Sequence, residues 1–339
     1  MAFPPVAATT VGSFPRPSWL AQRVGGAAEF VPEGDALDEA KDDATRLVIR
    51  EQEAVGLDLV TDGEQRRTSF IHHFIASLEG VDMVNRRDKV IRRKGVPRLV
   101  PTIVGKVRRR EDVVVADLLF AKGVAANPVK IAVPGPMTIV DSTFDETYGD
   151  EPALTMDIAA ALNEELLALQ AAGADALQID EPAMTRWPEK VADHGAAALD
   201  RCLEGVTVPT FVHLCYGYQG GQDAPYDQYE VFPYPPLLEM LMGTRIGGFS
   251  VEFERSRYDP AILAACEERD IMFGCVDPSG PEAPSVEYVV ERVRQALEYV
   301  PADRLLLSPD CGLMTVSREL AHAKVSVLAR AAAQVRAGL

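Results

Sequence analysis

The chain alternates short apolar runs with longer stretches in which apolar residues recur at helical spacing. Each apolar run is four to seven residues long and ends at polar or turn-forming residues, which is typical of buried β-strands. The eight predicted strands are Val6–Val11, Leu57–Asp62, Val129–Val133, Ala176–Asp180, Thr210–Cys215, Gly248–Glu254, Ile271–Val276 and Leu305–Ser308. The main predicted helices are Gly34–Ala54, Glu151–Ala172, Asp259–Arg269, Ser285–Tyr299 and Ser317–Ala337.

Eight strands joined by helical crossovers predict an α/β protein with a parallel sheet, and eight is the number that closes a (β/α)8 TIM barrel. An open doubly wound sheet is the alternative. No GxGxxG motif follows the first predicted strand, so the usual nucleotide-binding signature of such a sheet is missing. We therefore expect a single barrel domain over residues 1–339.

Residues Val84–Leu118 interrupt the alternation and predict an inserted β-hairpin-like excursion. Its possible strands are VPRLVPTIVGKV and DVVVADLLF. The segment is basic, since 11 of the 34 Lys and Arg residues fall in Arg86–Arg110. A solvated surface is the simpler interpretation. The alternative is a surface that guides an anionic substrate tail or docks a partner protein.

The acidic composition argues against some classes of binding partner. Thirty-four basic against 51 acidic residues give a net charge of −17, which argues against binding to nucleic acid or to anionic membranes. No apolar run reaches the roughly 20 residues of a membrane span, and the first residues lack a signal-peptide pattern, so we expect a cytoplasmic protein. Five scattered cysteines favour thiols or metal ligands over disulfides.

The tripeptide His213-Leu214-Cys215 carries the most specific chemical signal. Residues two apart in a strand share a face, so His213 and Cys215 could bind one metal ion or could be two buried structural residues. Glu252 lies in the strand FSVEFE, and Cys311 follows the last strand. The carboxyl ends of barrel strands meet at one mouth, which brings these four residues together. Histidine, thiolate and carboxylate ligands favour Zn²⁺, and a site this rich in negative charge suits activation of a thiol for alkylation.

Polar residues at three other strand ends could bind a small zwitterion. The acidic residues there, Asp62, Glu64, Asp180 and Glu181, could hold an ammonium group, while Ser13 and main-chain N–H groups could hold a carboxylate. The alternative is that such residues cap loops and helices.

Taken together, the motifs resemble the C-terminal, catalytic barrel of cobalamin-independent methionine synthase, a zinc enzyme that methylates homocysteine. They run through almost the whole chain as VGSFPRP, TDGE, VPGPMTI, QIDEPA, HLCYG, SVEFERSR, APSVE and SPDCGL. The resemblance implies four zinc ligands, which are His213, Cys215, Glu252 and Cys311, with Glu254 as the rival of Glu252. It also implies that Ser13, Glu64 and Asp180 hold the amino-acid substrate.

The sequence departs from that family at three points. The full-length enzyme has a second, N-terminal barrel, of which this sequence contains no part. Ser142 stands where full-length members have a tryptophan that stacks on the pterin, and Ser279 aligns with their catalytic histidine. The chain thus looks like a single-barrel member, whose methyl donor could be a folate, methylcobalamin on a corrinoid protein or a small methyl donor.

Two other functions stay open at this point. The chain could be an alkyl transferase resembling epoxyalkane:coenzyme M transferase, with Arg16, Arg66 and Arg67 near the mouth to bind a sulfonate. It could also be a non-catalytic partner that binds zinc or a corrinoid. A Gly-, Pro- and Tyr-rich stretch over residues 217–236 predicts a long loop at the mouth, either a lid or an ordinary surface loop.

Overall fold

Eight parallel strands form the centre of the computed structural model, which describes residues 3–24, 27–91, 97–217 and 233–339. Their order in the sheet is β1-β13-β12-β11-β10-β9-β7-β4. Their bounds are β1 Ala7–Ala8, β4 Val60–Thr61, β7 Val129–Pro134, β9 Ala176–Asp180, β10 Thr210–Leu214, β11 Gly248–Glu252, β12 Asp270–Gly274 and β13 Leu305–Ser308. A parallel bridge between Thr9 and Leu59 joins the first and last members of this order, so the sheet closes into a barrel. All eight predicted strands are confirmed.

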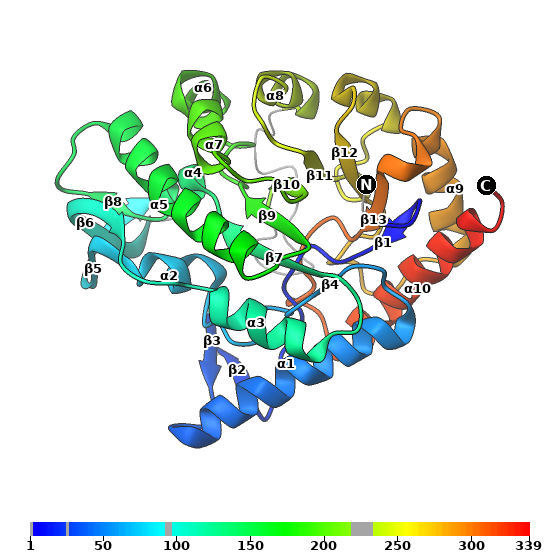
Figure 1. Ribbon diagram of the computed structural model, residues 1–339, viewed down its shortest axis with the longest axis horizontal. Coiled ribbons are helices and arrows are strands. Elements are labelled where there is room, and N and C mark those ends of the chain that lie inside the picture. The colour runs from blue at the N-terminus through cyan, green and yellow to red at the C-terminus, as the bar shows by residue number, and fades with distance from the viewer. Residues whose placement is uncertain (1–2, 25–26, 92–96, 218–232) are drawn as a thin grey trace.

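Helices surround the strands (Figure 1). The larger ones are α1 Asp35–Val55, α3 Val115–Val124, α5 Glu151–Ala171, α7 Ala196–Cys202, α8 Tyr234–Leu241, α9 Val286–Leu297 and α10 Arg318–Arg336. Short turns of helix are α2 Phe70–Ile75, α4 Pro136–Asp141, α6 Pro188–Lys190, the π-helix Val191–Gly195 and the 3-10 helices Pro260–Cys266 and Ala302–Arg304. The helix predicted over Asp259–Arg269 is therefore a shorter 3-10 helix.

The barrel interior changes character along the strands. At the amino ends, an apolar cluster fills the centre, built by Phe3, Ala7, Leu59, Ala176, Phe211, Met272 and Leu306. Because alternate residues share a face, the next inward residues of β7, β9, β10 and β11 are polar, namely Lys130, Gln178, His213 and Ser250. All four are buried. Burial of polar groups without partners is unfavourable, so this polar layer marks the beginning of the site.

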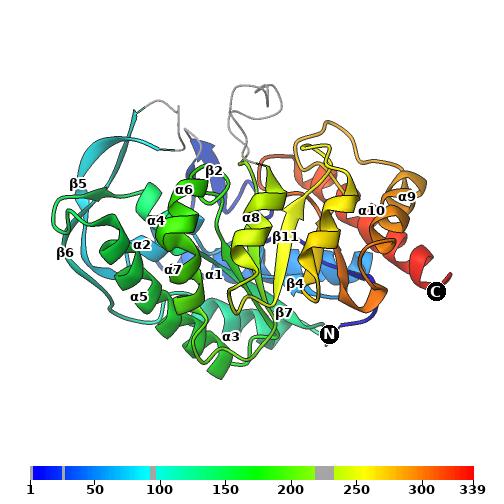
Figure 2. The ribbon, with the colours of Figure 1, turned by 90° about the horizontal axis from the view of Figure 1, so that it is seen from above.

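The excursion is a long antiparallel hairpin of β5 (Leu78–Val90) and β6 (Pro97–Arg109), extended by β8 (Phe144–Asp145). It lies on the opposite side of the barrel from α9 and α10 (Figures 1 and 2). The hairpin begins before the expected Val84. The segment DVVVADLLF was expected to be a strand, but its last six residues lie in α3. A second small hairpin consists of β2 (Ala21–Val24) and β3 (Ala27–Phe30).

The error at α3 has a physical cause. Three consecutive valines favour a strand, but the N–H groups of Val113 and Val114 donate to the carboxylate of Glu165 at 2.8–3.1 Å. Glu165 lies on α5 and satisfies main-chain donors that would otherwise remain free at the helix start. This partner is about fifty residues away along the chain, so the local pattern does not reveal it.

Within the described ranges, no helix has the length and apolar character needed to cross a bilayer. The cytoplasmic location expected from the sequence stays a prediction.

Candidate active site

Three of the four predicted metal ligands lie together at the carboxyl end of the barrel. The ligand atoms of His213, Cys215 and Cys311 are all within 4.8 Å of one another, and the Sγ atoms of the two cysteines are 3.8 Å apart. His213 lies on β10 with Cys215 just beyond the end of that strand, and Cys311 lies three residues beyond β13. Convergence of residues almost a hundred positions apart follows from the closure of the barrel.

The two ring nitrogens of His213 are in different environments, as in histidines that bind a metal ion. Its Nδ1 lies 2.9 Å from Ser250 Oγ on the neighbouring strand, while its buried Nε2 has no hydrogen-bond partner among the described residues. A buried ring nitrogen without a partner is costly, and metal-binding histidines usually have their other nitrogen hydrogen-bonded in this way. Two cysteine sulfurs beside that nitrogen give the donor set that zinc prefers. The residues present thus fit a zinc ion.

The two cysteines also differ in acidity. The pKa of Cys215 is well below its ordinary value, first because of the hydrogen bond from Cys311 and then because of His213. The pKa of Cys311 is raised, chiefly by the same hydrogen bond. One thiolate is therefore stabilised in the protein itself, as a metal ligand must be.

Glu252 lies at the end of β11 and is fully buried, but its carboxylate is not part of the close group of three. Its Oε2 accepts the N–H of Tyr216, the residue after Cys215, at 3.2 Å. The rival Glu254 is held elsewhere, because its two oxygens accept from Arg292 Nε at 2.7 Å and from the Tyr288 hydroxyl at 2.6 Å, both on α9. The geometry favours Glu252 as the fourth ligand, and this assignment stays a prediction.

Asp310 connects the two segments that carry Glu252 and Cys311. Its carboxylate accepts the N–H groups of Phe253, Glu254 and Arg255 at 2.8–3.2 Å. Gly274 makes room for it, since a Cβ at that position would lie 2.5 Å from Asp310 Oδ1. Burial raises the pKa of Asp310 to about 8, against the effect of these donors. The chain after β11 is thereby tied to the residue preceding Cys311.

The predicted substrate-binding residues border the same group. Asp180 is paired in register with His213 across β9 and β10. Ser13 Oγ lies against Gly312, directly after Cys311, and the Ser13 carbonyl accepts the N–H of Leu313. The structure therefore places Asp180 and Ser13 beside two of the candidate metal ligands.

Glu64 reaches the mouth from the loop after β4. It has a positive φ of 54°, which is unfavourable for a residue with a side chain and is found at functional sites. A Cβ on Gly12 would lie 2.8 Å from Glu64 Oε1, so the glycine leaves space for this carboxylate. Burial raises the pKa of Glu64 to about 7, although Arg67 acts in the opposite direction.

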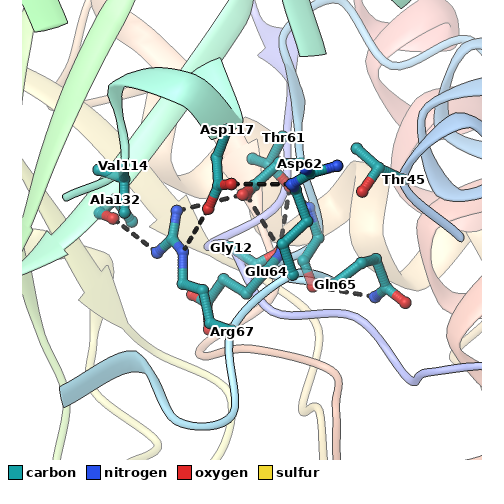
Figure 3. A network of polar contacts seen from close by, with 12 residues as sticks. Gly12, Thr45, Thr61, Asp62, Glu64, Gln65, Arg67, Val114, Asp117 and Ala132 are labelled. Atoms are coloured by element: carbon teal, nitrogen blue, oxygen red, sulfur yellow. Dashed lines mark hydrogen bonds and ion pairs between the residues drawn. The ribbon is translucent and has the colours of Figure 1, made fainter. Parts of the chain in front are cut away.

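The arginines of this region are occupied by structural contacts. Figure 3 shows the Arg67 guanidinium between the Ala132 carbonyl at 2.8 Å, Asp62 at 3.1 Å and Asp117 at 3.8 Å. Arg66 pairs with Asp42 and with Asp117, and Arg16 donates to the main-chain carbonyls of residues 64, 65 and 67. The cationic groups expected for sulfonate binding thus already have partners within the protein.

The family departures are also visible. Ser142 is buried at the end of α4, and the Ser279 hydroxyl donates to Asp277 at 2.7 Å and accepts from Arg255. Cys202, Cys266 and Cys275 are buried, as expected for structural residues. Most of the predicted mouth loop, residues 218–232, lies outside the described residues.

Several basic side chains of the hairpin have partners within the protein. Arg87 pairs with Glu146 and Arg109 with Glu165, both at 2.6 Å. Lys89 donates to two carbonyls at the end of α4. The role of this surface in guiding a tail or docking a partner stays a prediction.

Sequence reasoning missed Ser250, Asp310, Lys130 and Gln178. A signal for three of them exists, because Lys130, Gln178 and Ser250 are polar residues within apolar strands and alternate with apolar ones. The role of Asp310 depends on a distant turn and has no local signal.

The chain is similar to several known proteins. A family model described as the catalytic domain of cobalamin-independent synthase matches residues 6–219 and 240–334. Methionine synthases of Pyrococcus horikoshii and Saccharolobus solfataricus are each 30% identical, over 99% and 94% of this chain and 94% and 91% of their own lengths. A B12-independent methionine synthase from Shewanella sp. W3-18-1, solved in complex with selenomethionine, is 34% identical over 99% of both chains with a TM-score of 0.93.

A Listeria monocytogenes structure titled a putative vitamin-B12 independent methionine synthase is 22% identical with a TM-score of 0.76 and supports the fold alone. The family model spans most of the chain, and the relatives are matched over nearly their whole lengths. This chain belongs to the cobalamin-independent methionine synthase family, in the part that forms the catalytic domain.

Proposed function

We propose that this protein is a zinc-dependent methyltransferase that methylates the thiol of homocysteine to form methionine. The observation that carries the proposal is the buried Nε2 of His213, which has no hydrogen-bond partner in the described part of the chain and lies beside the sulfurs of Cys215 and Cys311. The family and the methionine synthases among its relatives support the same reaction.

His213, Cys215, Cys311 and Glu252 would hold the zinc ion. Bound there, zinc would lower the pKa of the substrate thiol and keep it a nucleophilic thiolate near neutral pH. Ser250 fixes the ring of His213 through Nδ1 and leaves Nε2 for the metal. Asp310, the residue before Cys311, accepts main-chain N–H groups just after Glu252 and so fixes the two segments relative to each other.

Asp180, Glu64 and Ser13 would bind the amino-acid end of homocysteine. The two carboxylates would pair with its ammonium group, and Ser13 would donate to its carboxylate. Because Asp180 and Ser13 border the metal-binding group and Glu64 lies against Gly12, next to Ser13, a bound homocysteine could direct its thiol toward the metal. The solved Shewanella relative holds selenomethionine, the selenium analogue of the product.

In this proposal, the methyl donor is not the polyglutamate folate that full-length family members use. Ser142 offers no aromatic ring for a pterin, and Ser279 is a hydrogen-bonded serine rather than a titratable imidazole. Methylcobalamin on a corrinoid protein, a simple folate and a small methyl donor are the candidates.

The test combines metal analysis with a methyl-transfer assay. Purified protein should contain about one zinc per chain, as expected for one four-ligand site. It should form methionine from homocysteine with methylcobalamin or with methyltetrahydrofolate monoglutamate. Cys311→Ser should lose both zinc and activity, whereas Cys266→Ser is the matched control because Cys266 is a buried cysteine in the 3-10 helix Pro260–Cys266.

Two results would contradict the proposal. A Cys311→Ser variant that is metal-free yet fully active would remove the metal from the reaction. A wild-type protein that binds zinc but forms methionine with none of the three donor classes would reject homocysteine methylation and favour another electrophile or a non-catalytic role.

A further inference from the structure

A lysine lies inside the barrel, beneath the candidate substrate site. Lys130, on β7, is fully buried, and its position alternates with apolar residues that pack outward toward the helices. The interiors of such barrels are usually filled by branched apolar residues. In the part of the chain that the structure describes, no carboxylate forms an ion pair with its Nζ. A buried ammonium without a paired charge is unfavourable. A lysine at this buried position is therefore expected to have a functional role.

The contacts of Lys130 lead to Asp180. Its Nζ donates to the Val11 carbonyl at 2.9 Å and to Gln178 Oε1. Gln178 is also fully buried, and its Nε2 donates to Asp180 Oδ1 at 2.7 Å. Gln178 and Asp180 are two residues apart on β9 and therefore share its inward face.

Lys130 determines which way the Gln178 amide points. A lysine ammonium can only donate hydrogen bonds, so the oxygen of the amide must face it. The NH₂ group then faces Asp180, where it can only be satisfied by an acceptor such as a carboxylate oxygen. Without Lys130 the amide could rotate and turn its oxygen toward Asp180, which would repel the carboxylate.

The charges near Lys130 are consistent with this arrangement. Burial lowers the pKa of Lys130 to about 7, while Asp180, Glu64 and Asp62 act in the opposite direction. These carboxylates are close enough to interact with the ammonium through space, although none contacts it. In its protonated form, which these carboxylates favour and burial opposes, the lysine places positive charge below the two carboxylates that are proposed to bind substrate.

We propose that Lys130 and Gln178 are positioning residues that orient the Asp180 carboxylate toward the ammonium group of the amino-acid substrate. With Oδ1 held by Gln178, the second oxygen of Asp180 would be the one that pairs with the substrate. The inference rests on the proposed function, since it requires an α-amino acid at this site.

The test compares two ligands that differ only in the ammonium group. Binding of L-methionine and of its des-amino analogue, 4-(methylthio)butanoate, is measured by calorimetry on the zinc-loaded protein. Lys130→Met and Gln178→Leu should each weaken L-methionine binding by about tenfold, as expected when a buried charged acceptor loses its donor. The same variants should change binding of the analogue less than about twofold. A general loss of packing would weaken both ligands alike.

A double-mutant cycle and a control make the test specific. In an Asp180→Asn background, Gln178→Leu should add little further loss of L-methionine affinity, because both changes act on one interaction. Lys324→Met is the matched control, since Lys324 is another buried lysine whose Nζ donates to main-chain carbonyls, those of Asp277, Gly280 and Glu282. It should affect both ligands equally or neither.

The inference is overturned if the losses at Gln178 and Asp180 are additive, or if Lys130→Met and Gln178→Leu weaken both ligands equally. If Lys130→Met does not fold, Gln178→Leu and its cycle with Asp180→Asn decide the question. A wild-type protein that binds no L-methionine overturns the proposed function and this inference with it, a result distinct from selective failure of the variants.

Discussion

The carboxylate of Glu64 combines three features that are unfavourable for stability. Its backbone has a positive φ, its side chain is buried against Gly12, and burial raises its pKa to about 7. Each feature is unfavourable for the free protein, and burial leaves the Glu64 carboxyl at the mouth with a pKa near neutral pH. A substrate ammonium group would offset this by supplying the missing positive charge.

We expect binding of the amino-acid end to depend on pH through Glu64. As the pH rises through about 7, Glu64 loses its proton and gains a negative charge, so binding of L-methionine should tighten. L-methionine is the suitable probe because it has no thiol that titrates. Glu64→Gln should bind about tenfold more weakly above pH 7 and should lose this part of the pH dependence.

The control for Glu64 is Glu146→Gln, which removes a carboxylate that pairs with Arg87 on the hairpin. It should keep the wild-type pH profile. A Glu64→Gln variant with an unchanged profile between pH 6 and 8 would show that another group, such as Lys130, governs the dependence.

Residue-level chemistry was predictable where it follows strand periodicity. The i, i+2 spacing of His213 and Cys215 predicted a shared inward face, and the meeting of strand ends predicted their approach to Cys311. Contacts that depend on side-chain direction were not predictable. The choice between Glu252 and Glu254 depends on the hydrogen bonds of Glu254 with α9, which no spacing reveals.

At the scale of elements, the candidate site depends on how the loops after β11 and β13 are joined. Asp310 follows β13, and its carboxylate binds three successive N–H groups of the turn after Glu252. A buried carboxyl group that accepts three successive main-chain donors holds a turn firmly, because losing it would leave those N–H groups without partners. The positions of Glu252 and Cys311 are therefore set jointly.

Asp310→Ala should accordingly weaken zinc binding by about ten- to a hundredfold, the usual effect of removing a group that orients metal ligands. Competition with a chelating dye measures this directly. Asp145→Ala is the matched control, since Asp145 also accepts the N–H groups of three residues of a turn, Thr147, Tyr148 and Gly149, in the hairpin sheet. Equal zinc affinity in wild type and Asp310→Ala would show that the two loops hold their positions independently.

Element type was predictable from periodicity along most of the chain, and the exceptions have tertiary causes. The barrel strands follow from apolar runs, whereas α3 begins within a run of valines because Glu165 of α5 binds the N–H groups of the two residues just before it, Val113 and Val114. Local strand preference is weaker than such a buried charge-assisted contact. Residues 115, 118 and 121 of α3 are buried, a helical spacing that the valines concealed.

At the scale of the whole molecule, the candidate metal site joins distant parts of the barrel. The segment of β10 and the residue after it, and the segment after β13, each supply candidate ligands, and between them lie β11 and β12 in the sheet order. A ligand that binds only the folded state stabilises that state. A metal ion at this position would link strands across one side of the barrel, so metal binding and the stability of the whole fold should be coupled.

Adding zinc to the chelator-treated protein should therefore raise its thermal unfolding temperature. At a free zinc concentration of about 100 times the dissociation constant, the expected stabilisation is about 2.7 kcal/mol, which corresponds to a rise of several degrees. Differential scanning calorimetry at buffered zinc concentrations measures the shift, which should grow with the logarithm of zinc concentration. Cys311→Ser should show little or no shift, whereas Cys266→Ser should respond like the wild type because this buried cysteine is not a member of the ligand group. An equal zinc-dependent rise in wild type and Cys311→Ser would place the stabilising ion elsewhere in the molecule.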